Sequence, residues 1–375
     1  MKIMFVMLLS SWDCSRNTGG TDSVCQLLLK GAINDKNNQY LVIGFNPFND
    51  TKGDVTKIDL ASNISLHLYN SIQNKRSIFH RIIPNLFYQN WIVKSEVLDF
   101  QPDIIHVHVP CWLLFKYNKV KRILTLHTYK NICRKDFGFL NHMLYIWFAT
   151  PITIKHSTLI TTVSRDIEFL LQKERIPAVY IPNPILDDFF RVERKIVNKQ
   201  IIVLPSNVVP RKRIQDALKV IERVRAEFPQ IKLYIAGIYK KDSYYKELTT
   251  FIEQHNLQEN IIFLGQISVH ELCELYSKAQ VGLFLSEEET FGLAPLEMIA
   301  ARLPIVTTKV GVLKHEENFA SLDIDMVGIG DIKETSATLS RILMTKSEGS
   351  LPAVDFIRRK YSLASITSQY LEVYQ

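Results

Sequence analysis

The sequence predicts an α/β protein built from two parallel-sheet lobes, and two observations lead to this expectation. Short apolar runs alternate along the whole chain with longer amphipathic segments, a pattern typical of βα units in a parallel sheet. The chain has 375 residues, which is too long for one ordinary hydrophobic core and favours two domains. We therefore expect two Rossmann-like lobes in sequence.

Each expected element rests on an apolar run or on an amphipathic repeat. The expected strands of the first half are Ile3–Leu9, Tyr40–Phe45, Ile104–His108, Arg122–His127, Leu159–Val163 and Val179–Ile181, with helices at Asp22–Asn34 and Arg165–Glu174. The expected strands of the second half are Gln200–Leu204, Lys232–Ala236, Ile261–Leu264, Val281–Leu285 and Ile305–Thr307, with helices at Ile214–Phe228, Val269–Lys278 and Ala294–Ala301.

The domain boundary is expected near Ile181-Pro-Asn-Pro-Ile185, because two prolines forbid a continuing helix and favour an extended linker. This divides the chain into a first domain, 1–187, and a second domain, 188–354. The remaining segment, 355–375, has apolar residues at helical spacing and is expected to form a helix that packs on another element.

The net charge of +7 belongs entirely to the first half. Up to Asp187 there are 21 Lys and Arg against 14 Asp and Glu, whereas 24 face 24 in the remainder. A basic lobe suits an anionic surface, and the segment 75–87 interleaves Lys and Arg with apolar residues as a bilayer-lying helix would. A helix packed on the lobe's own core gives the same pattern. Nucleic acid is the less favoured partner because no basic-aromatic motif accompanies the charge.

Neither a membrane span nor a disulfide framework is expected. The run 137–154 contains Asn, His and Pro and falls short of a span, and Ile3–Leu9 is followed by Trp-Asp rather than by a cleavage site, so it is interpreted as a buried strand. The five cysteines are scattered and form no C-x-x-C. We expect a cytoplasmic protein, with peripheral contact at the inner face of the membrane through its basic lobe.

A short glycine loop follows the first strand. Gly19 and Gly20 lie in Thr-Gly-Gly-Thr-Asp ahead of a helix, where small residues and free amides favour an anion. A simple strand-to-helix turn has the same appearance. The spacing is not G-x-G-x-x-G, which disfavours a dinucleotide oxidoreductase.

Three histidines end two neighbouring expected strands. His106 and His108 close one strand, and His127 closes the next. Ligands of open α/β sheets collect at the carboxyl ends of the strands, so these histidines are candidates for a site. Packed core histidines are the alternative. A metal site at His106 and His108 lacks an evident third ligand, because Asp103 falls on the opposite face of the strand.

A basic loop follows the first strand of the second half. Arg211, Lys212 and Arg213 stand ahead of a helix, and cations at a helix start oppose the helix dipole unless an anion is bound. Arg and Lys at the carboxyl edge of a sheet suit a diphosphate. A solvated helix start is the alternative.

The most specific pattern is the run 286–297, Ser-Glu-Glu-Glu-Thr-Phe-Gly-Leu-Ala-Pro-Leu-Glu. Glu289 and Glu297 are separated by seven residues, which places one carboxylate in a loop and the other about one turn into a helix. The amides of Thr290, Phe291, Gly292 and Leu293 lie between them and suit a phosphate, and carboxylates suit sugar hydroxyls. The pattern fits a nucleoside diphosphate sugar.

The sequence resembles the retaining GT-B glycosyltransferases, specifically glycosyltransferase family 4, also called group 1. The motifs that carry the resemblance span nearly the whole chain. They are the Gly19-Gly20 loop, Thr125-Leu-His127, Thr162-Val-Ser164, Ile181-Pro-Asn-Pro, Pro210-Arg-Lys212, the E-x7-E run with the following Pro304-Ile-Val, Val310-Gly311 and the closing helix.

The resemblance implies roles for the matching positions. Glu297 matches the residue that binds the donor ribose, Glu289 the residue that touches the donor sugar, and Lys212 the lysine that binds the diphosphate, with Arg211 beside it. His127 matches the active-site histidine near the transferred sugar. Gly19 and Gly20 match the loop that covers the phosphates.

The resemblance also implies an architecture and a reaction. Two Rossmann-like domains would face a central cleft, with the acceptor bound by the first domain and the nucleotide sugar by the second. The closing helix, 355–375, would return to the first domain. Transfer with retention, without a metal or a cofactor, would then move a sugar to a glycan or a lipid-linked acceptor, as in surface polysaccharide synthesis.

Two positions depart from the family pattern. The family usually has an arginine five or six positions before Lys212, where this chain has Ser206 or Asn207, so we expect Arg211 or Arg213 to substitute. It also usually has a glycine where Arg302 stands, at a turn after a helix that favours left-handed backbone geometry. The departures leave open a second hypothesis, a non-catalytic binding partner of another transferase. An epimerase or phosphorylase is a third, but neither predicts E-x7-E.

Overall fold

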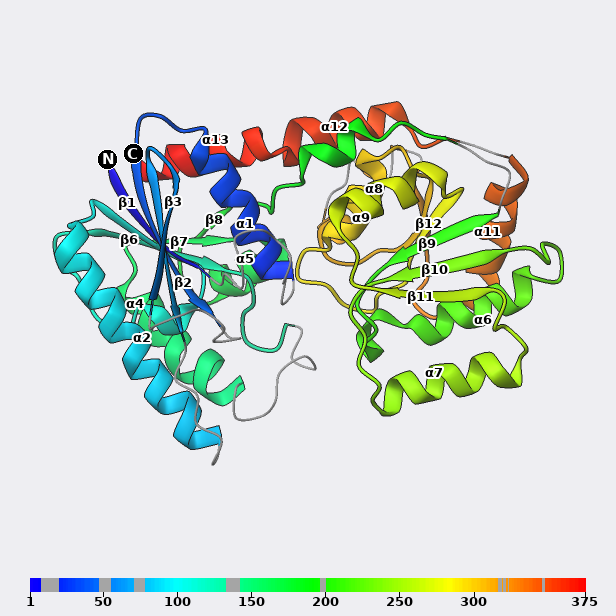
Figure 1. Cartoon of the computed structure of the whole chain (residues 1–375), viewed down its shortest axis with the longest axis horizontal. Coiled ribbons are helices and arrows are strands. Elements are labelled where there is room, and N and C mark those ends of the chain that lie inside the picture. Colours follow the sequence, from blue (N-terminus) through cyan, green and yellow to red (C-terminus); the bar gives the residue numbers. More distant parts are fainter. Residues whose placement is uncertain are drawn as a thin grey trace. The chain divides into compact units, whose positions relative to one another are not determined.

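The computed structural model divides the chain into two compact α/β units (Figure 1). Unit 1 comprises Met1–Pro184 and Leu363–Gln375, and unit 2 comprises Ile185–Ser362. The structure describes residues 1–7, 20–46, 55–70, 78–132, 142–195, 200–315, 319, 322, 324–345 and 348–375.

Unit 1 is built on a largely parallel sheet. Its strands are β1 (Lys2–Met7), β2 (Gln39–Asn46), β3 (Val55–Ala61), β4 (Ile64–Asn70), β5 (Ile104–Val107), β6 (Lys121–Leu126), β7 (Leu159–Thr162) and β8 (Val179–Tyr180). The strand order is β3-β4-β2-β1-β5-β6-β7-β8, and β3 is antiparallel to β4. The sheet order changes direction at β1, so the loops after β1 and β5 begin side by side.

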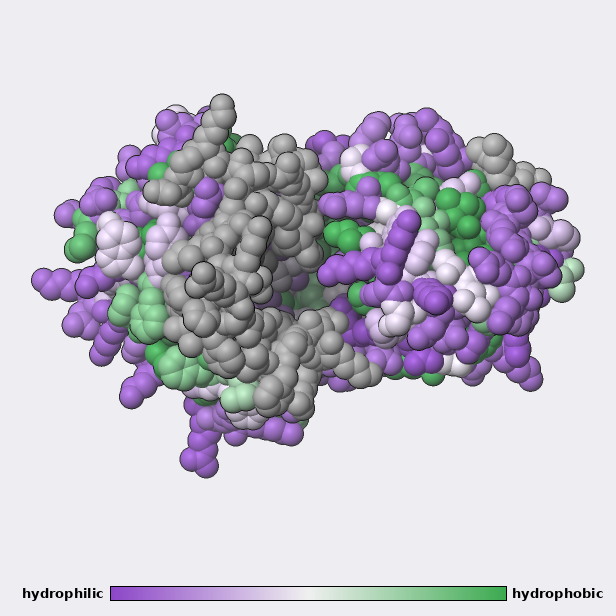
Figure 2. All heavy atoms as spheres, turned by 60° about the horizontal axis from the view of Figure 1, so that its bottom comes forward, coloured by the Kyte–Doolittle hydropathy of each residue, from purple (hydrophilic) through white to green (hydrophobic). Residues whose placement is uncertain are grey.

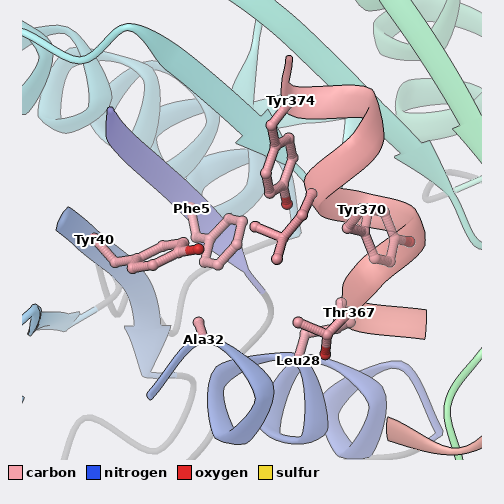
Figure 3. Close-up of a pocket in the computed structure, with 8 residues that line it drawn as sticks. Phe5, Leu28, Ala32, Tyr40, Thr367, Tyr370 and Tyr374 are labelled. Carbon is pink, nitrogen blue, oxygen red and sulfur yellow. The ribbon is translucent and has the colours of Figure 1, made fainter. Parts of the chain in front are cut away.

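Helices cover both faces of this sheet. They are α1 (Gly20–Ile33), α2 (Ile78–Phe100), η1 (Pro110–Trp112), the π-helix η3 (His142–Ala149), α4 (Thr150–His156), α5 (Arg165–Lys173) and α13 (Leu363–Tyr374). Alternate residues of β1 serve the two faces: Met4 and Val6 join the core with α2 and η1, while Phe5 lies with α1 and α13. Figure 3 shows Tyr370 and Tyr374 of α13 on the same side as Phe5, above Leu28 of α1.

Unit 2 is built on a second parallel sheet. Its strands are β9 (Ile201–Pro205), β10 (Lys232–Ala236), β11 (Ile261–Gly265), β12 (Val281–Phe284), β13 (Ile305–Thr308) and β14 (Asp325–Val327), in the order β11-β10-β9-β12-β13-β14. The chain adds strands on one side of β9 and then on the other. The point at which the order reverses therefore lies between β9 and β12.

The helices of unit 2 form two layers. They are η4 (Asp187–Arg191), η5 (Pro210–Lys212), α6 (Ile214–Val224), α7 (Ser243–Gln254), α8 (Val269–Lys278), α9 (Leu293–Ala300), α10 (Val312–His315), α11 (Ile332–Thr345) and α12 (Leu351–Tyr361). Ile202 and Leu204 of β9 pack with α6, α7 and α11, and Val203 packs with α9 and α12. Because both faces are covered, the strands are apolar throughout instead of alternating.

The unit boundary differs slightly from the expected one. The division falls at Pro184–Ile185 rather than after Asp187, because Ile185 is fully buried in the core of unit 2 and its amide donates to the Tyr361 carbonyl at 2.8 Å. The expected closing helix is two helices. α12 packs in unit 2 against α9, while α13 packs in unit 1 against α1, with a break at Ser362.

The α/β prediction is confirmed, and the expected strands and helices lie within a few residues of the observed bounds where the structure describes them. The hairpin of β3 and β4 and the helices α7 and α11 were not expected from the sequence. Cys25, Cys111 and Cys273 are free thiols, and Cys14 and Cys133 lie outside the described residues.

Candidate active site

The basic loop and the E-x7-E run meet at the carboxyl ends of two adjacent strands. Lys212 follows β9, and Glu289 follows β12, its neighbour in the sheet. The Glu287 amide donates to the Arg211 carbonyl at 3.0 Å, which joins the two loops directly. Open α/β sheets bind ligands where the strand order reverses, and these loops stand at that point of unit 2.

Glu289 is the centre of a compact charged cluster. Its Oε1 lies 2.5 Å from Lys212 Nζ, 3.1 Å from Arg211 Nη1 and 2.7 Å from the donating Ser286 hydroxyl. Arg211 Nη1 also donates to the Glu288 carbonyl at 2.6 Å. Two cations and one carboxylate therefore share one spot, and the cluster carries an excess positive charge.

The cluster is largely removed from water. The side chain of Glu289 is 10% exposed, that of Lys212 16% and that of Arg211 12%. Burial raises the pKa of the Glu289 carboxyl, but the charges of Lys212 and Arg211 outweigh burial and hold that pKa below its ordinary value. Glu289 is therefore ionised at neutral pH and orients both cations.

The turn between Glu289 and α9 presents backbone amides. Gly292 has φ of 87°, a left-handed conformation that costs other residues about 1–2 kcal/mol. Among the described residues, nothing accepts the amides of Phe291, Gly292 or Leu293. The Phe291 ring itself is buried in the core of unit 2, in edge contact with Tyr361. Phe291 thus fixes the turn through its side chain, and the expected contact with a ligand concerns its backbone.

The loop after β13 supports this turn from behind. The Val312 amide donates to the Phe291 carbonyl at 2.7 Å. Gly311 has φ of 57°, and a Cβ on it would lie 2.3 Å from the same carbonyl oxygen, so this close approach requires glycine. The Thr308 hydroxyl donates to the Ser286 carbonyl at 2.6 Å. The E-x7-E loop is therefore anchored to β13 and to the loop that follows it.

Glu297 lies on α9, about one turn beyond the loop. Part of its surface stays accessible, yet the protein surrounds its carboxyl group, and burial raises its pKa to about 7. Within the described part of the chain, no group donates a hydrogen bond to the carboxyl group of Glu297. A buried carboxyl group without a partner is costly and is a feature of functional sites.

The histidines of unit 1 form a row across the ends of β5 and β6. His106 is fully buried, and its nitrogens lie 2.8 Å from the Tyr374 hydroxyl and 2.7 Å from the Thr125 hydroxyl. His108 Nδ1 lies 3.1 Å from His127 Nε2. Burial lowers the pKa of His127 to about 4, so this imidazole is neutral at pH 7. With both nitrogens of His106 engaged, the row does not form the metal pair that the sequence left open.

The sequence of unit 2 matches a known protein family. Residues 187–318 match the model of the family described as Glycosyl transferases group 1. This segment of unit 2 matches the group 1 glycosyltransferases. This glycosyltransferase is 24% identical over 342 residues to N-acetyl-alpha-D-glucosaminyl L-malate synthase of Bacillus anthracis, with 79% of the chain and 85% of that relative covered. It is 25% identical over 179 residues to O-antigen chain mannosyltransferase RfbU of Salmonella typhimurium, with 46% and 48% covered.

Solved structures show the fold of this glycosyltransferase. A sucrose-phosphate synthase from Thermosynechococcus elongatus matches with a TM-score of 0.78 at 16% identity, with 100% of this chain and 98% of that chain covered. Anabaena HepE in complex with UDP and glucose matches with a TM-score of 0.72 at 14% identity, with 100% and 99% covered. The fold is GT-B, and both the group 1 resemblance and the fold prediction are confirmed.

The first departure from the family pattern has a structural use. Asn207 Oδ1 accepts the Ile238 amide at 2.9 Å and so fastens the loop after β9 to the end of β10. Of the two expected substitutes for the missing arginine, Arg211 faces Glu289. Arg213 instead pairs with Asp216 at 2.5 Å and with Glu287 at 3.5 Å.

The second departure keeps the backbone of the glycine that it replaces. Arg302 has φ of 55°, and its amide donates to the Ile299 carbonyl at 2.9 Å, as at a helix end closed by glycine. Its guanidinium pairs with Glu348, and its carbonyl accepts the Gly349 amide at 3.0 Å. The left-handed turn is therefore preserved rather than reshaped.

Three further observations concern the glycine loop, metal binding and membrane spans. Gly20 is the exposed first residue of α1 with open space around it, and Gly19 lies outside the described residues. Within the described ranges, no cluster of three or more His, Cys, Asp or Glu side chains is placed to hold a metal ion. No described helix combines the length and the apolar character needed to cross a bilayer.

The sequence did not single out Ser286, and it indicated His108 only as one of three histidines at strand ends, without a role of its own. Ser286 donates to Glu289, and His108 contacts His127, so each touches an expected site residue. A serine at the end of an apolar strand and a second histidine two positions after the first are weak signals. Their partners become apparent once the strand order is known.

Proposed function

We propose that this protein is a retaining glycosyltransferase of family 4 that transfers a sugar from a nucleoside diphosphate sugar to a glycan or lipid-linked acceptor in surface polysaccharide or glycoconjugate synthesis. The observation that carries the proposal is the Lys212–Arg211–Glu289 cluster beside the amides of Gly292 and Leu293, which donate to no acceptor among the described residues. Fixed cations and helix-start amides are what a diphosphate requires.

The reaction follows from this charge distribution. When the bond between the anomeric carbon and the diphosphate breaks, negative charge grows on the leaving oxygen, and the excess positive charge of the cluster stabilises it without a metal. The acceptor hydroxyl forms the new bond on the same face, and its proton passes to the leaving phosphate oxygen.

The other residues of the proposed site bind the donor. Glu289 accepts hydrogen bonds from the sugar hydroxyls with its remaining oxygen, and Glu297 accepts hydrogen bonds from the ribose hydroxyls. By the family resemblance we assign His127 to the transferred sugar and Gly19 and Gly20 to the phosphates, and we propose that no cofactor takes part.

A thermal-shift panel of UDP, GDP, ADP and their sugars tests this proposal. A ligand that binds only the folded state raises the melting temperature. When the ligand concentration is one hundred times the Kd, the folded state is stabilised by about 2.7 kcal/mol. We expect one base to stand out, and the matching donor to be turned over when acceptor extracts are supplied. Tight binding with neither hydrolysis nor transfer would favour the non-catalytic partner instead.

Glu297 supplies a prediction on affinity and on pH. Changing Glu297 to Ala removes a charge-assisted hydrogen bond to the ribose. Such a bond contributes about 1.5–3 kcal/mol to binding, so nucleotide affinity is expected to fall about tenfold or more. Since bound hydroxyls favour the ionised carboxylate, affinity in the wild type should fall as pH drops below the Glu297 pKa of about 7. Isothermal titration at several pH values measures both effects.

The Glu297→Gln variant is the matched control for pH. A carboxyl group whose pKa is raised by folding destabilises the fold as pH rises from its ordinary value, 4.5, to about 7. The Gln variant lacks this loss, so it should melt at a higher temperature than the wild type above pH 7 while binding nucleotide less tightly. Unchanged nucleotide affinity in both variants would contradict the ribose assignment.

The acceptor side of the proposal includes peripheral contact with an anionic bilayer. Large apolar side chains are exposed on two helices of unit 1: Phe87, Trp91 and Leu98 on α2, and Met143, Trp147 and Phe148 on η3. Figure 2 shows apolar side chains among hydrophilic ones on the forward part of unit 1. Tryptophan favours the membrane interface, and the lobe is basic. Lys75 and Arg76 lie outside the described residues.

Vesicle sedimentation tests this contact. We expect binding to vesicles rich in phosphatidylglycerol that weakens with salt, because each Lys or Arg near an anionic surface contributes about 1 kcal/mol. A Trp91→Ser/Trp147→Ser variant should lose most of the binding, whereas Phe169→Ser, which alters an exposed aromatic residue on α5, should retain it. Absence of binding, or binding insensitive to salt, would remove the bilayer from the proposal.

A further inference from the structure

The contact between His108 and His127 constrains where protons reside. His108 Nδ1 and His127 Nε2 are 3.1 Å apart, and the two rings are tilted by 34° with centroids 5.4 Å apart. A neutral imidazole has one N–H and one lone-pair nitrogen. One of the two facing nitrogens therefore donates and the other accepts, and the choice fixes the proton position in both rings.

The surroundings of His108 decide between the two arrangements. The residue is 2% exposed, and its second nitrogen, Nε2, is buried and has no partner in the described part of the chain. If His127 donated, His108 would have to place its own proton on that isolated Nε2. Buried N–H groups without an acceptor are rarer in native proteins than under-satisfied acceptors. The arrangement with the proton on His108 Nδ1 avoids the isolated donor.

The ring of His108 is also held in place. His106 lies beside it with centroids 4.3 Å apart, and Phe5 contacts it edge-on at 6.5 Å. His106 is itself fixed by Tyr374 and Thr125. Burial lowers the pKa of His108 well below its ordinary value, in keeping with a neutral ring at pH 7. His108 thus offers His127 a fixed and uncharged donor.

We propose that His108 is a positioning residue that donates its Nδ1 proton to His127 Nε2 and thereby holds the His127 proton on Nδ1. His127 Nδ1 bonds to no described residue, so its N–H is available to an oxygen of a ligand. Resting on the proposed function, that oxygen is a hydroxyl of the transferred sugar. His127 then acts as a hydrogen-bond donor and not as a general base, because it has no lone pair on the free nitrogen.

Long-range proton–nitrogen correlation spectra of protein labelled with ¹⁵N-histidine test the proposal in the ligand-free enzyme. The two neutral tautomers give different nitrogen shifts, and the His127 and His108 signals are assigned by their loss in His127→Asn and His108→Asn. We expect the proton on Nδ1 in both rings. A proton on Nε2 of His127 in the wild type would overturn the proposal.

Two variants of His108 separate positioning from packing. In His108→Asn the side-chain amide can donate from near the Nδ1 position, so the His127 Nδ1–H signal and turnover should be largely retained. In His108→Leu the donor is lost, so His127 should shift towards the Nε2–H tautomer, and kcat should fall about 10–100-fold with nucleotide affinity unchanged. A Leu variant with the wild-type spectrum and kcat would also overturn the proposal. The spectra need no ligand. If His127 showed the expected tautomer but the protein had no transfer activity, the proposed function would be refuted while the positioning role of His108 would stand.

Discussion

Changing Lys212 to Met is expected to lower kcat by about 10²–10³-fold, the range found when one fixed donor to a developing negative charge is removed. The ammonium lies 2.5 Å from Glu289 Oε1 in a site largely shielded from water, where such a charge acts strongly on a leaving diphosphate. Met retains most of the length and the apolar surface of the stem. Steady-state kinetics with the donor identified by the thermal-shift panel measure the loss.

The fold should tolerate this change. Glu289 keeps Arg211 at 3.1 Å and the Ser286 hydroxyl at 2.7 Å, so its carboxylate remains partnered. We expect a loss of about 1–3 kcal/mol in the free energy of unfolding. Lys246→Met, which removes an exposed lysine from α7 of the same unit, is the matched control and should leave kcat unchanged. Equal activity of the Lys212 and Lys246 variants would refute the role of the cluster.

Local sequence patterns sufficed to place the strands and the loops that follow them. The strands that precede Lys212, Glu289 and His127 are apolar runs of ordinary length, and each of these residues follows its strand as expected. The pairing of Lys212 with Glu289 was not predictable in this way. The residues are 77 positions apart, and their contact depends on β9 and β12 being neighbours.

The hairpin of β3 and β4 shows why other elements were missed. Ile64, Leu66 and Leu68 alternate with less buried residues, which is a strand signal. The connecting turn, Ser62-Asn63, lacks the glycine that usually marks a two-residue hairpin. The alternation of apolar runs with amphipathic segments indicates parallel strands and gives no signal for a short antiparallel pair at the sheet edge.

Arg302 shows a limit of another kind. The sequence correctly indicated left-handed geometry at this turn, and the structure has φ of 55° there. The local pattern did not indicate that the Arg302 guanidinium pairs with Glu348, 46 positions further along the chain. A contact with a distant side chain depends on packing and cannot be read from a local motif.

Changing His127 to Ala is expected to lower kcat about 10²-fold while leaving the affinity for the free nucleotide within about twofold, because a transition-state contact to the sugar is lost. The physical reason is the division of labour between the units. His127 follows β6 of unit 1, whereas the cations, the turn amides and Glu297 that would bind the nucleotide all belong to unit 2. Kinetics and isothermal titration with the nucleoside diphosphate separate the two quantities.

His270→Ala, which alters an exposed histidine on α8, is the matched control and should change neither quantity. The Ala variant of His127 also leaves His108 Nδ1 without its partner, so a loss of about 1–3 kcal/mol in unfolding free energy is expected and must be measured alongside. If affinity and kcat fell together, His127 would act in binding the nucleotide. If kcat did not change, the histidine row would have a structural role only, and the proposed catalysis would rest on the residues of unit 2 alone.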